Sequence, residues 1–341
     1  MSRAPGHRPA RPAAGSVDRL DLTYVLPLRW ADDADLNDLT GYLRWLAQRV
    51  EVTVVDGSPP ALFARHAAHW GGYVRHLRPD PWLRYANGKV NGVTTGLRTA
   101  RHERVVIADD DVRYDDVGLR TMRRLLDRAE LVRPQNYFWP LPWHARWDTG
   151  RTLLNRAFGA DYPGTFGIRR STFLEMGGYH GDVLFENLEL IRTVRGHGGR
   201  ELIAAGLHVR RRPPPAGKFW SQRVRQAYDD LAQPARMALF LAVLPGLAVA
   251  IARGWRAVPI TAGLGVVALA EAGRRRANGA AVFPASTVLL APIWVGERAV
   301  CSWLALATRW GRGGVSYAGQ RIRTAAHSQR RLTRSGSGAG R

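Results

Sequence analysis

Three consecutive aspartates, Asp109, Asp110 and Asp111, follow the apolar run VVIA in the stretch RVVIADDDV. Adjacent carboxylates repel one another unless positive charge lies among them. A divalent cation supplies that charge, and Mg²⁺ or Mn²⁺ prefers oxygen ligands while leaving positions for the phosphates of a substrate. The run therefore predicts a divalent-metal site that binds a diphosphate, although aspartates that cap a helix or lie in a solvated turn give the same spacing.

The acidic run lies in a strongly basic chain of 341 residues, with 50 Lys and Arg against 28 Asp and Glu and a formal net charge of +22. Such an excess favours a phosphate-rich partner, a nucleic acid or an anionic membrane face. A nucleic-acid-binding protein would carry a recognisable module with basic and aromatic residues on one face. The sequence has no such module, so no nucleic-acid partner is expected. The single cysteine, Cys301, excludes an intramolecular disulfide and a CxxC metal site.

The elements that must position the aspartates alternate between strand and helix patterns. β-branched runs predict strands over Leu22–Leu28 and Glu51–Gly57, and the stretch between them has apolar residues at helical spacing. A third strand is expected over Arg104–Asp111, after a helix from about Lys89 to Ala100. This order predicts an α/β domain with a largely parallel sheet flanked by helices.

Further carboxylates accompany the aspartate run. Asp56 ends the second predicted strand, and ligands bind at the carboxyl ends of strands in open α/β sheets, so Asp56 and the aspartate run are expected to face one crevice. In ENLELIRTV, Glu186 and Glu189 lie three residues apart on one face of a predicted helix. A carboxylate within hydrogen-bond reach of a hydroxyl takes its proton as a general base. Both glutamates are expected to line the cleft; capping or flanking the helix is the alternative.

Together these stretches resemble the nucleotide-sugar-binding domain of family-2 glycosyltransferases, which have the GT-A fold. The resemblance covers about residues 20–230 and rests on YVLPLRW, VVDGSPP, NGKVNGVTTGLRTARHERVVIADDDV and GGYHGDVLFENLELIRTVRGHGG. It implies a membrane-anchored bacterial enzyme that moves a sugar from a nucleotide-sugar donor to an acceptor hydroxyl of a lipid or glycan. It also implies inversion of the anomeric configuration and dependence on Mn²⁺ or Mg²⁺.

The resemblance assigns roles to four of these residues. Asp56 matches an acidic residue that contacts the base or ribose of the nucleotide, and Lys89 matches a basic donor-binding position at a helix start. Asp109 and Asp111 match the outer positions of the DxD motif, whose carboxylates hold the metal against the donor diphosphate. A nucleotidyltransferase is the other enzyme class considered, but it would need a Gly-rich phosphate loop after the first strand, where LPLRWADD offers only Arg29.

The position of the general base departs from the family pattern. Asn187 stands where family members have the Asp that deprotonates the acceptor. An amide cannot accept a proton at neutral pH, so Glu186 is the first choice for this role and Glu189 the second.

A second departure lies in KFWSQRVRQAYDD, which resembles the family's QxxRW motif. Gln222 and Arg225 occupy the matching places, and Gln226 replaces the Trp, which disfavours a processive polymer synthase. Arg223 and Arg225 are expected to steady the departing diphosphate. Because of Asn187 and Gln226, a catalytically degenerate homologue that acts as a membrane-bound binding subunit is the alternative function.

Beyond Pro234 the sequence becomes apolar. Four uncharged stretches follow: Met237–Ala252, Ala257–Ala270, Ala280–Gly296 and Ala299–Ala307. Trp255, Trp294 and Trp303 suit a membrane interface, and Arg clusters such as residues 274–276 suit the cytoplasmic side. Buried core helices of a soluble protein are the alternative.

The expected organisation has four parts. A flexible basic tail covers residues 1–19, a GT-A-like transferase domain 20–233, hydrophobic membrane segments 234–309, and a basic cytoplasmic tail 310–341. The protein is expected to be a multi-pass protein of the cell membrane, serving the cell envelope with a cytoplasmic catalytic domain. The first two apolar stretches would form one hairpin. Residues 280–307 would form a second hairpin or re-entrant pair, with Glu297 and Arg298 at its turn.

Overall fold

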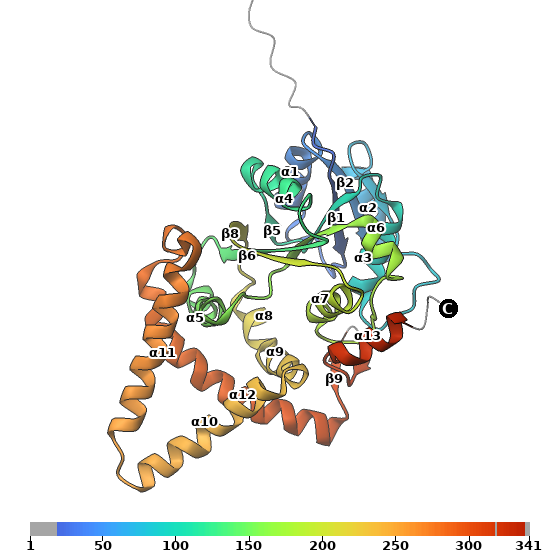
Figure 1. Cartoon of the computed structure of the whole chain (residues 1–341). Helices are drawn as coiled ribbons and strands as arrows, with labels where there is room; N and C mark the ends of the chain where they lie inside the picture. Colours follow the sequence, from blue (N-terminus) through green and yellow to red (C-terminus); the bar gives the residue numbers. More distant parts are fainter. Residues whose placement is uncertain (1–18, 318, 338–341) are drawn as a thin grey trace, which may run out of the picture.

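A computed structural model describes residues 19–317 and 319–337 (Figure 1). The tail expected over residues 1–19 therefore lies, except for its last residue, outside the described residues. The centre of the molecule is one eight-stranded sheet with the order β3-β2-β1-β4-β7-β6-β8-β5. Its strands are β1 (Thr23–Leu28), β2 (Glu51–Asp56), β3 (Arg75–Leu77), β4 (Arg104–Ala108), β5 (Val112–Arg113), β6 (Leu131–Phe138), β7 (Thr165–Arg169) and β8 (Glu201–Arg211).

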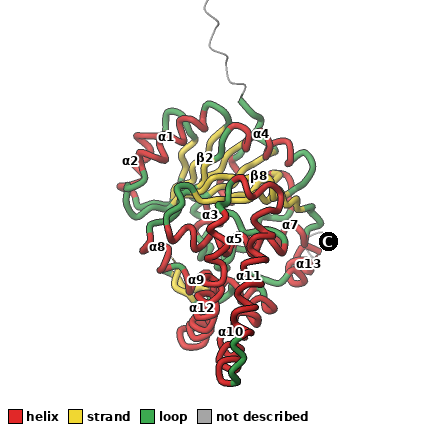
Figure 2. The backbone as a smooth tube through the Cα atoms, turned by 90° about the vertical axis from the view of Figure 1, so that its left-hand side faces the viewer, coloured by secondary structure: helices red, strands yellow, loops and turns green. Residues whose placement is uncertain are grey.

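Helices cover both faces of the sheet (Figures 1 and 2). They are α1 (Leu36–Ala47), α2 (Pro60–Trp70), α3 (Gly88–Thr99), α4 (Asp116–Leu125), α5 (Trp143–Phe158), α6 (Arg170–Glu175), α7 (Glu186–Gly196), α8 (Ala216–Ser221), α9 (Arg223–Tyr228) and the short 3₁₀ helix η1 (Asp229–Ala232). Strand β1 shows why its apolar run is continuous: Tyr24 and Leu26 pack in the core with α1 and α4, whereas Val25 packs with α3. A strand buried on both faces needs apolar residues at every position.

The direction of the strands differs from the expected largely parallel sheet. The half β3-β2-β1-β4 is parallel, as is the pair β6-β8, but β7 runs antiparallel to both β4 and β6, and β5 runs antiparallel to β8. The α/β class is confirmed and the sheet is mixed. A hydrophobic pattern indicates whether a strand is buried but not the direction in which it runs. The first strands form βαβ units and are parallel, but the later strands do not all follow this direction.

Beyond Pro234 the chain forms long apolar helices: α10 (Pro234–Ala252), α11 (Ala257–Arg275) and α12 (Ala291–Arg312), with the 3₁₀ helices η2 (Arg276–Ala281) and η3 (Ala285–Leu290) between the last two. Three segments, 234–252, 257–281 and 285–312, are long and apolar enough to cross a membrane. In Figure 1, α10 and α11 extend away from the sheet and meet at the lower left of the view.

The hairpin of α10 and α11 exposes large apolar side chains along its length. Leu239 is 64% exposed, Ile251 75% and Leu264 65%. A contiguous apolar surface of this kind marks a contact with lipid or with another protein. At its other end α11 is fixed to the body, because the buried guanidinium of Arg156 donates hydrogen bonds to the carbonyl oxygens of Gly273 (3.0 Å) and Arg276.

The expected second hairpin is wrong. Glu297 and Arg298 lie inside the continuous helix α12 and not at a turn. Both charges have partners inside the protein: the Glu297 carboxylate accepts from Nε of Arg223 (2.9 Å), and Nη1 of Arg298 lies 3.4 Å from the Asp230 carboxylate. Buried charges that are paired do not require the helix to break. Trp294 also departs from its expected interface position, since it is buried.

The described segment after α12 folds back onto the body. After α12 it forms the antiparallel strands β9 (Val315–Tyr317) and β10 (Gln320–Ile322) and then helix α13 (Gln329–Ser337), which packs on α7. The backbone N–H groups of Leu184 and Phe185 donate to the carbonyl oxygens of Thr324 (3.0 Å) and Ala325 (2.8 Å). The described part of this basic segment is therefore an ordered addition to the α/β body.

Candidate active site

Four element ends meet at one edge of the sheet and bring charged side chains together. Lys89 lies in the first turn of α3, Asp109 follows β4, Glu186 begins α7 and Arg211 ends β8. The Asn87 side chain caps α3 by accepting from the Lys89 N–H (3.1 Å), and its amide donates to the Val183 carbonyl oxygen (3.2 Å). This cap ties the start of α3 to the segment that leads into α7.

Two cations lie among the carboxylates at this edge. The Lys89 ammonium is 2.7 Å from Oδ1 of Asp109 and 2.9 Å from Oε1 of Glu186. Arg211 donates from Nη2 to Oδ2 of Asp109 (3.3 Å) and from Nε to both carboxylate oxygens of Asp111 (2.9 Å each). Burial acts to lower the pKa of Lys89, but Asp109 and Glu186 together raise it well above its usual value. Lys89 is therefore a permanent cation.

The three aspartates are not equivalent. Asp110 accepts a hydrogen bond from the indole N–H of Trp30, whereas Asp109 and Asp111 share Arg211. Burial, together with the charges of Asp109 and Asp110, raises the pKa of Asp111 to about 6 against the opposing effect of Arg211. Negative charge is thus crowded at Asp111 even with a guanidinium beside it.

The donor atoms of Asp109 and Asp111 fit a divalent cation. They are carboxylate oxygens held around one shared positive group, and hard oxygen ligands suit Mg²⁺ and Mn²⁺. Gly164 permits the close approach, because a Cβ at this position would lie 2.7 Å from Oδ2 of Asp109 and 3.0 Å from Cζ of Arg211. The outer aspartates are therefore suited to hold a metal together with an anionic ligand.

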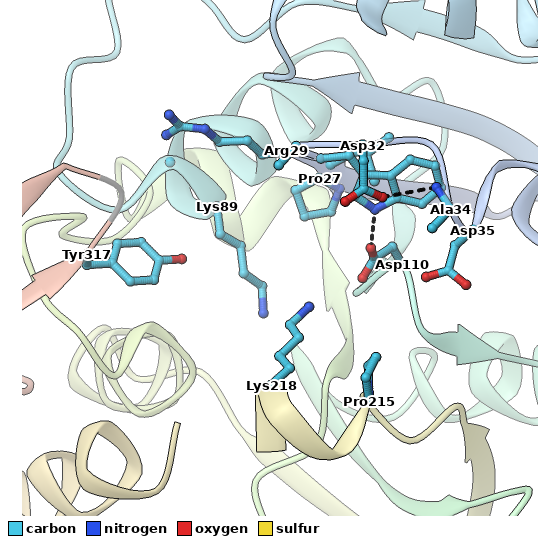
Figure 3. Close-up of a pocket in the computed structure, with 14 residues that line it drawn as sticks. Pro27, Arg29, Asp32, Ala34, Asp35, Lys89, Asp110, Pro215, Lys218 and Tyr317 are labelled. Carbon is cyan, nitrogen blue, oxygen red and sulfur yellow. Dashed lines mark hydrogen bonds between the residues drawn. The ribbon is translucent and has the colours of Figure 1, made fainter. Parts of the chain in front are cut away.

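Two cavities of about 540 and 550 Å³ meet beside these residues. The first lies against the end of β1 and the start of α3, where Arg29 and Gly88 line it. The second extends from the aspartates to α5, α8 and α9. Lys89 and Lys218 line both cavities, and Figure 3 shows their ammonium groups pointing toward each other. Two ammonium groups therefore border the shared region, whose lining also includes the carboxylates of Asp35 and Asp110.

Most of the residues selected from the sequence converge on the second cavity. Its lining includes Lys89, Asp109, Asp111, Glu186, Gln222 and Arg225. These residues come from four separate parts of the chain, so their convergence is a property of the fold and not of any single motif.

Glu189 and Asn187 are placed elsewhere. Glu189 is fully buried, and its carboxylate accepts from the backbone N–H of His327 (2.7 Å) and lies 2.7 Å from Nδ1 of the same residue. The Asn187 amide donates to the Pro163 carbonyl oxygen (3.2 Å). The expectation that Glu189 lines the cleft with Glu186 is therefore wrong, because the C-terminal segment covers this part of α7.

Asp56 also lies outside the residues that line the two cavities. Its side chain is fully buried; Oδ1 accepts from the Ser58 N–H (2.8 Å), and Oδ2 lies 2.6 Å from Nδ1 of His66 and 3.0 Å from Nε2 of His76. Burial acts to raise the pKa of Asp56, but the hydrogen bonds from His76, Ser58 and His66 hold it well below the usual range. In this structure the carboxylate fixes the turn after β2, and its donor-binding role remains a prediction.

Two residues of the site were not singled out from the sequence. Arg211 was one of several arginines in a basic run, and its partners lie about a hundred positions earlier in the chain. Trp30 follows the predicted first strand, and its indole bonds Asp110. The only local feature that could have indicated Trp30 is its position as an aromatic residue with a polar N–H just after a strand end. No local feature indicated Arg211.

Arg223 and Arg225 have different surroundings. Arg223 is 2% exposed; it donates from Nη1 to Asp148 (2.9 Å) and to the Gln226 side chain (2.9 Å), in addition to its bond with Glu297. Arg225 lines the second cavity. The expectation that Arg223 steadies a diphosphate is wrong, since its donors are used inside the protein. The Gln226 side chain accepts from Arg223 and so supports this buried ion pair.

Arg223→Met is expected to destabilise the fold by about 3–5 kcal/mol, because it leaves the Glu297 carboxylate without its cation and leaves Asp148 with Arg151 alone. Arg225→Met removes a cation from the cavity wall and should leave the melting temperature nearly unchanged while lowering transfer. Thermal unfolding of both variants in detergent, measured beside turnover, distinguishes the two roles. An Arg223→Met protein with wild-type melting temperature would contradict the structural role.

No protein-family model matches the sequence, and no curated protein matches it. Among solved structures, the mannosyltransferase PcManGT from Pyrobaculum calidifontis, determined with GDP-Man and Mn²⁺, is 18% identical with a TM-score of 0.48, covering 87% of this chain and 90% of that chain. Glucosyl-3-phosphoglycerate synthase from Mycobacterium tuberculosis, with Mn²⁺, UDP and phosphoglyceric acid, is 18% identical with a TM-score of 0.41, covering 63% and 79%. Mannosyl-3-phosphoglycerate synthase from Rubrobacter xylanophilus is 15% identical with a TM-score of 0.41, covering 63% and 75%. All three TM-scores are below 0.5, so a function for this chain must be argued from its own residues.

Proposed function

We propose that the protein is a membrane-integrated, inverting glycosyltransferase of the family-2, GT-A type, which uses a nucleotide-sugar donor and a divalent metal. The observation that carries the proposal is the cluster of Lys89, Asp109, Asp111, Glu186 and Arg211 at the wall of a cavity beside the strand ends. It combines oxygen ligands for a metal, cations for a diphosphate and a carboxylate for proton transfer.

The donor diphosphate is assigned to the region shared by the two cavities. Lys89 and Lys218 flank this region, and Arg225 lines the adjoining wall of the second cavity. Asp109 and Asp111 would hold Mn²⁺ or Mg²⁺, which would supply positive charge to stabilise the negative charge that develops on the departing diphosphate. The nucleoside then extends into the first cavity, and the sugar into the second.

Transfer proceeds as a single displacement. The acceptor hydroxyl oxygen forms a bond to the anomeric carbon while the bond from that carbon to the diphosphate oxygen breaks, and the electron pair of the broken bond leaves with the nucleoside diphosphate. Glu186 takes the hydroxyl proton. In this structure the Lys89 ammonium pairs with Glu186. When the donor binds, Lys89 pairs with the diphosphate instead, which leaves the Glu186 carboxylate free to take the proton.

The acceptor is a lipid or glycan reached from the membrane side. The exposed apolar hairpin of α10 and α11 supports insertion in a bilayer. We assign the α/β body to the cytoplasmic side, because the Arg cluster at residues 274–276 follows the hairpin and positive residues favour that side. Trp143 and Trp220 are about half exposed, with ring centroids 6.1 Å apart, beside the cavity walls formed by α5 and α8. Amphipathic aromatic rings suit the region between water and lipid.

Membrane insertion of the hairpin predicts a specific effect of charge. Leu239→Arg combined with Leu264→Arg should reduce the fraction of protein that stays in the membrane after an alkaline carbonate wash, since each Arg at a helix centre costs about 2.5–3.5 kcal/mol on insertion. The control is Val117→Arg, at a side chain that is 71% exposed on α4. Equal retention of the double variant and the control would contradict insertion of α10 and α11.

The proposed activity is tested by donor turnover. The detergent-purified full chain is incubated with UDP-, GDP- and dTDP-sugars in the presence of Mn²⁺ or Mg²⁺, and release of the nucleoside diphosphate is measured. Metal-dependent release from one donor class is the expected result. No release from any donor, with no binding of the nucleoside diphosphates, would favour a non-catalytic binding subunit.

A further inference from the structure

The segment that follows the apolar helices reaches the cavities. Tyr317, the last residue of β9, lines both of them. About 130 positions separate this residue from Glu186, and the whole set of apolar helices lies between them in the chain. The described residues therefore place a C-terminal side chain at the same wall as the residues of the α/β body.

Hydrogen bonds fix this segment to the part of the chain that carries Glu186. The residues directly before Glu186 donate backbone hydrogen bonds to Thr324 and Ala325, and the buried carboxylate of Glu189 accepts from His327. The Tyr228 hydroxyl adds a bond to the Arg323 carbonyl oxygen (2.8 Å). The segment is thus held against α7 and α9 at several points along its length.

The two parts of the Tyr317 side chain have different contacts. Its ring lies against the guanidinium of Arg225, with Cζ 4.8 Å from the ring centroid. Its hydroxyl points toward the Lys89 side chain in Figure 3 and makes no hydrogen bond to any residue in the described part of the chain. Burial, followed by the charge of Glu186, raises the pKa of Tyr317, so the hydroxyl keeps its proton at neutral pH.

A neutral hydroxyl beside cations suits an anionic ligand. The Lys89 and Lys218 ammonium groups and the Arg225 guanidinium are donors only, so they cannot accept the Tyr317 proton. The Tyr317 O–H is consequently available to an acceptor in the cavity. Lys218 has no ion-pair partner among residues 19–317 and 319–337, so the cavities that Tyr317 lines also contain an unpaired positive charge.

We infer that Tyr317 binds the diphosphate of the donor: its hydroxyl donates a hydrogen bond to a diphosphate oxygen, and its ring positions Arg225 against the same group. This inference rests on the proposed function and adds a residue to it from beyond the apolar helices. The C-terminal segment is then part of the donor site, and the bond between Glu189 and His327 positions that segment.

The test is Tyr317→Phe, which removes the hydroxyl and keeps the ring on Arg225. A hydrogen bond to a charged group predicts a loss of about 10- to 100-fold in kcat/KM for the donor, with a similar weakening of GDP or UDP binding in the presence of Mn²⁺. Tyr73→Phe, a hydroxyl deletion at a residue outside the lining of both cavities, is the matched control and should behave as the wild type. The melting temperature without nucleotide should be unchanged in Tyr317→Phe.

A second readout does not depend on turnover. If the segment contacts the diphosphate, GDP or UDP with Mn²⁺ should slow trypsin cleavage after Arg321 and Arg323 in the wild type, and Tyr317→Phe should lose most of this protection. Wild-type kinetics, wild-type nucleotide affinity or undiminished protection in Tyr317→Phe would overturn the inference while leaving the transferase proposal in place. A wild-type protein that neither turns over a donor nor binds a nucleoside diphosphate would overturn both.

Discussion

Asp109→Asn and Asp111→Asn are each expected to lower sugar transfer by about 100- to 1,000-fold, the cost of removing one preorganised electrostatic group from a transition state. The amide keeps the shape of the side chain but removes the negative charge that the metal requires. Arg211, which contacts both carboxylates, would also lose one of its two anionic partners. Initial rates at saturating donor and metal measure the effect.

Asp110→Asn is the matched control for these variants. It changes the same functional group in the adjacent position, but its carboxylate faces the Trp30 indole and not Arg211. We expect its effect on the rate to be much smaller than that of its neighbours. Equal losses at all three aspartates would contradict the distinct role of the outer pair, and full activity in Asp109→Asn would exclude it as a metal ligand.

Glu186→Gln is expected to lower kcat by about 100- to 10,000-fold, the range for removing a general base. The amide keeps the hydrogen-bonding shape but cannot take the acceptor proton. Because the donor contacts are made by other residues, the KM for the donor should change much less than kcat.

Glu189→Gln separates a catalytic from a structural glutamate. Glu189 is fully buried against His327, so its replacement is expected to loosen the C-terminal segment and lower the melting temperature. At low temperature kcat should be retained, while the KM for the donor should rise because the same segment carries Tyr317. Wild-type kcat in Glu186→Gln, or loss of chemistry without loss of stability in Glu189→Gln, would reverse the assignment. Retained activity in Asn187→Asp would show that this position tolerates a carboxylate.

The sequence predicted the parts of the site that depend on local pattern. The aspartates follow a buried strand, and Lys89 follows an asparagine that caps a helix, so their residue types and positions in the chain were sufficient. Local pattern did not predict which charges pair across the fold. Arg211 meets Asp111 and Tyr317 meets Arg225 only after the sheet and the C-terminal segment have folded.

The same distinction explains the expectations that the structure corrects. Glu297 and Arg298 were placed at a turn because charges interrupt an apolar run, but their partners lie on α9 and η1, out of reach of any local pattern. Glu189 was placed in the cleft by helical spacing, which gives the face of a helix but not what covers it. The first two apolar stretches do form long helices, since their length and composition are local properties, whereas the last two join in α12 after a short 3₁₀ helix.

The most direct test of the central claim is calorimetric titration of GDP and of UDP into the detergent-purified full chain, with and without Mn²⁺, in the wild type and in Asp109→Asn. The cluster of Lys89, Asp109, Asp111, Glu186 and Arg211 predicts saturable binding of one nucleoside diphosphate. This binding should depend on Mn²⁺ and be lost in Asp109→Asn. Absence of binding in the wild type, or equal metal-independent binding in both proteins, would contradict a diphosphate site at these aspartates.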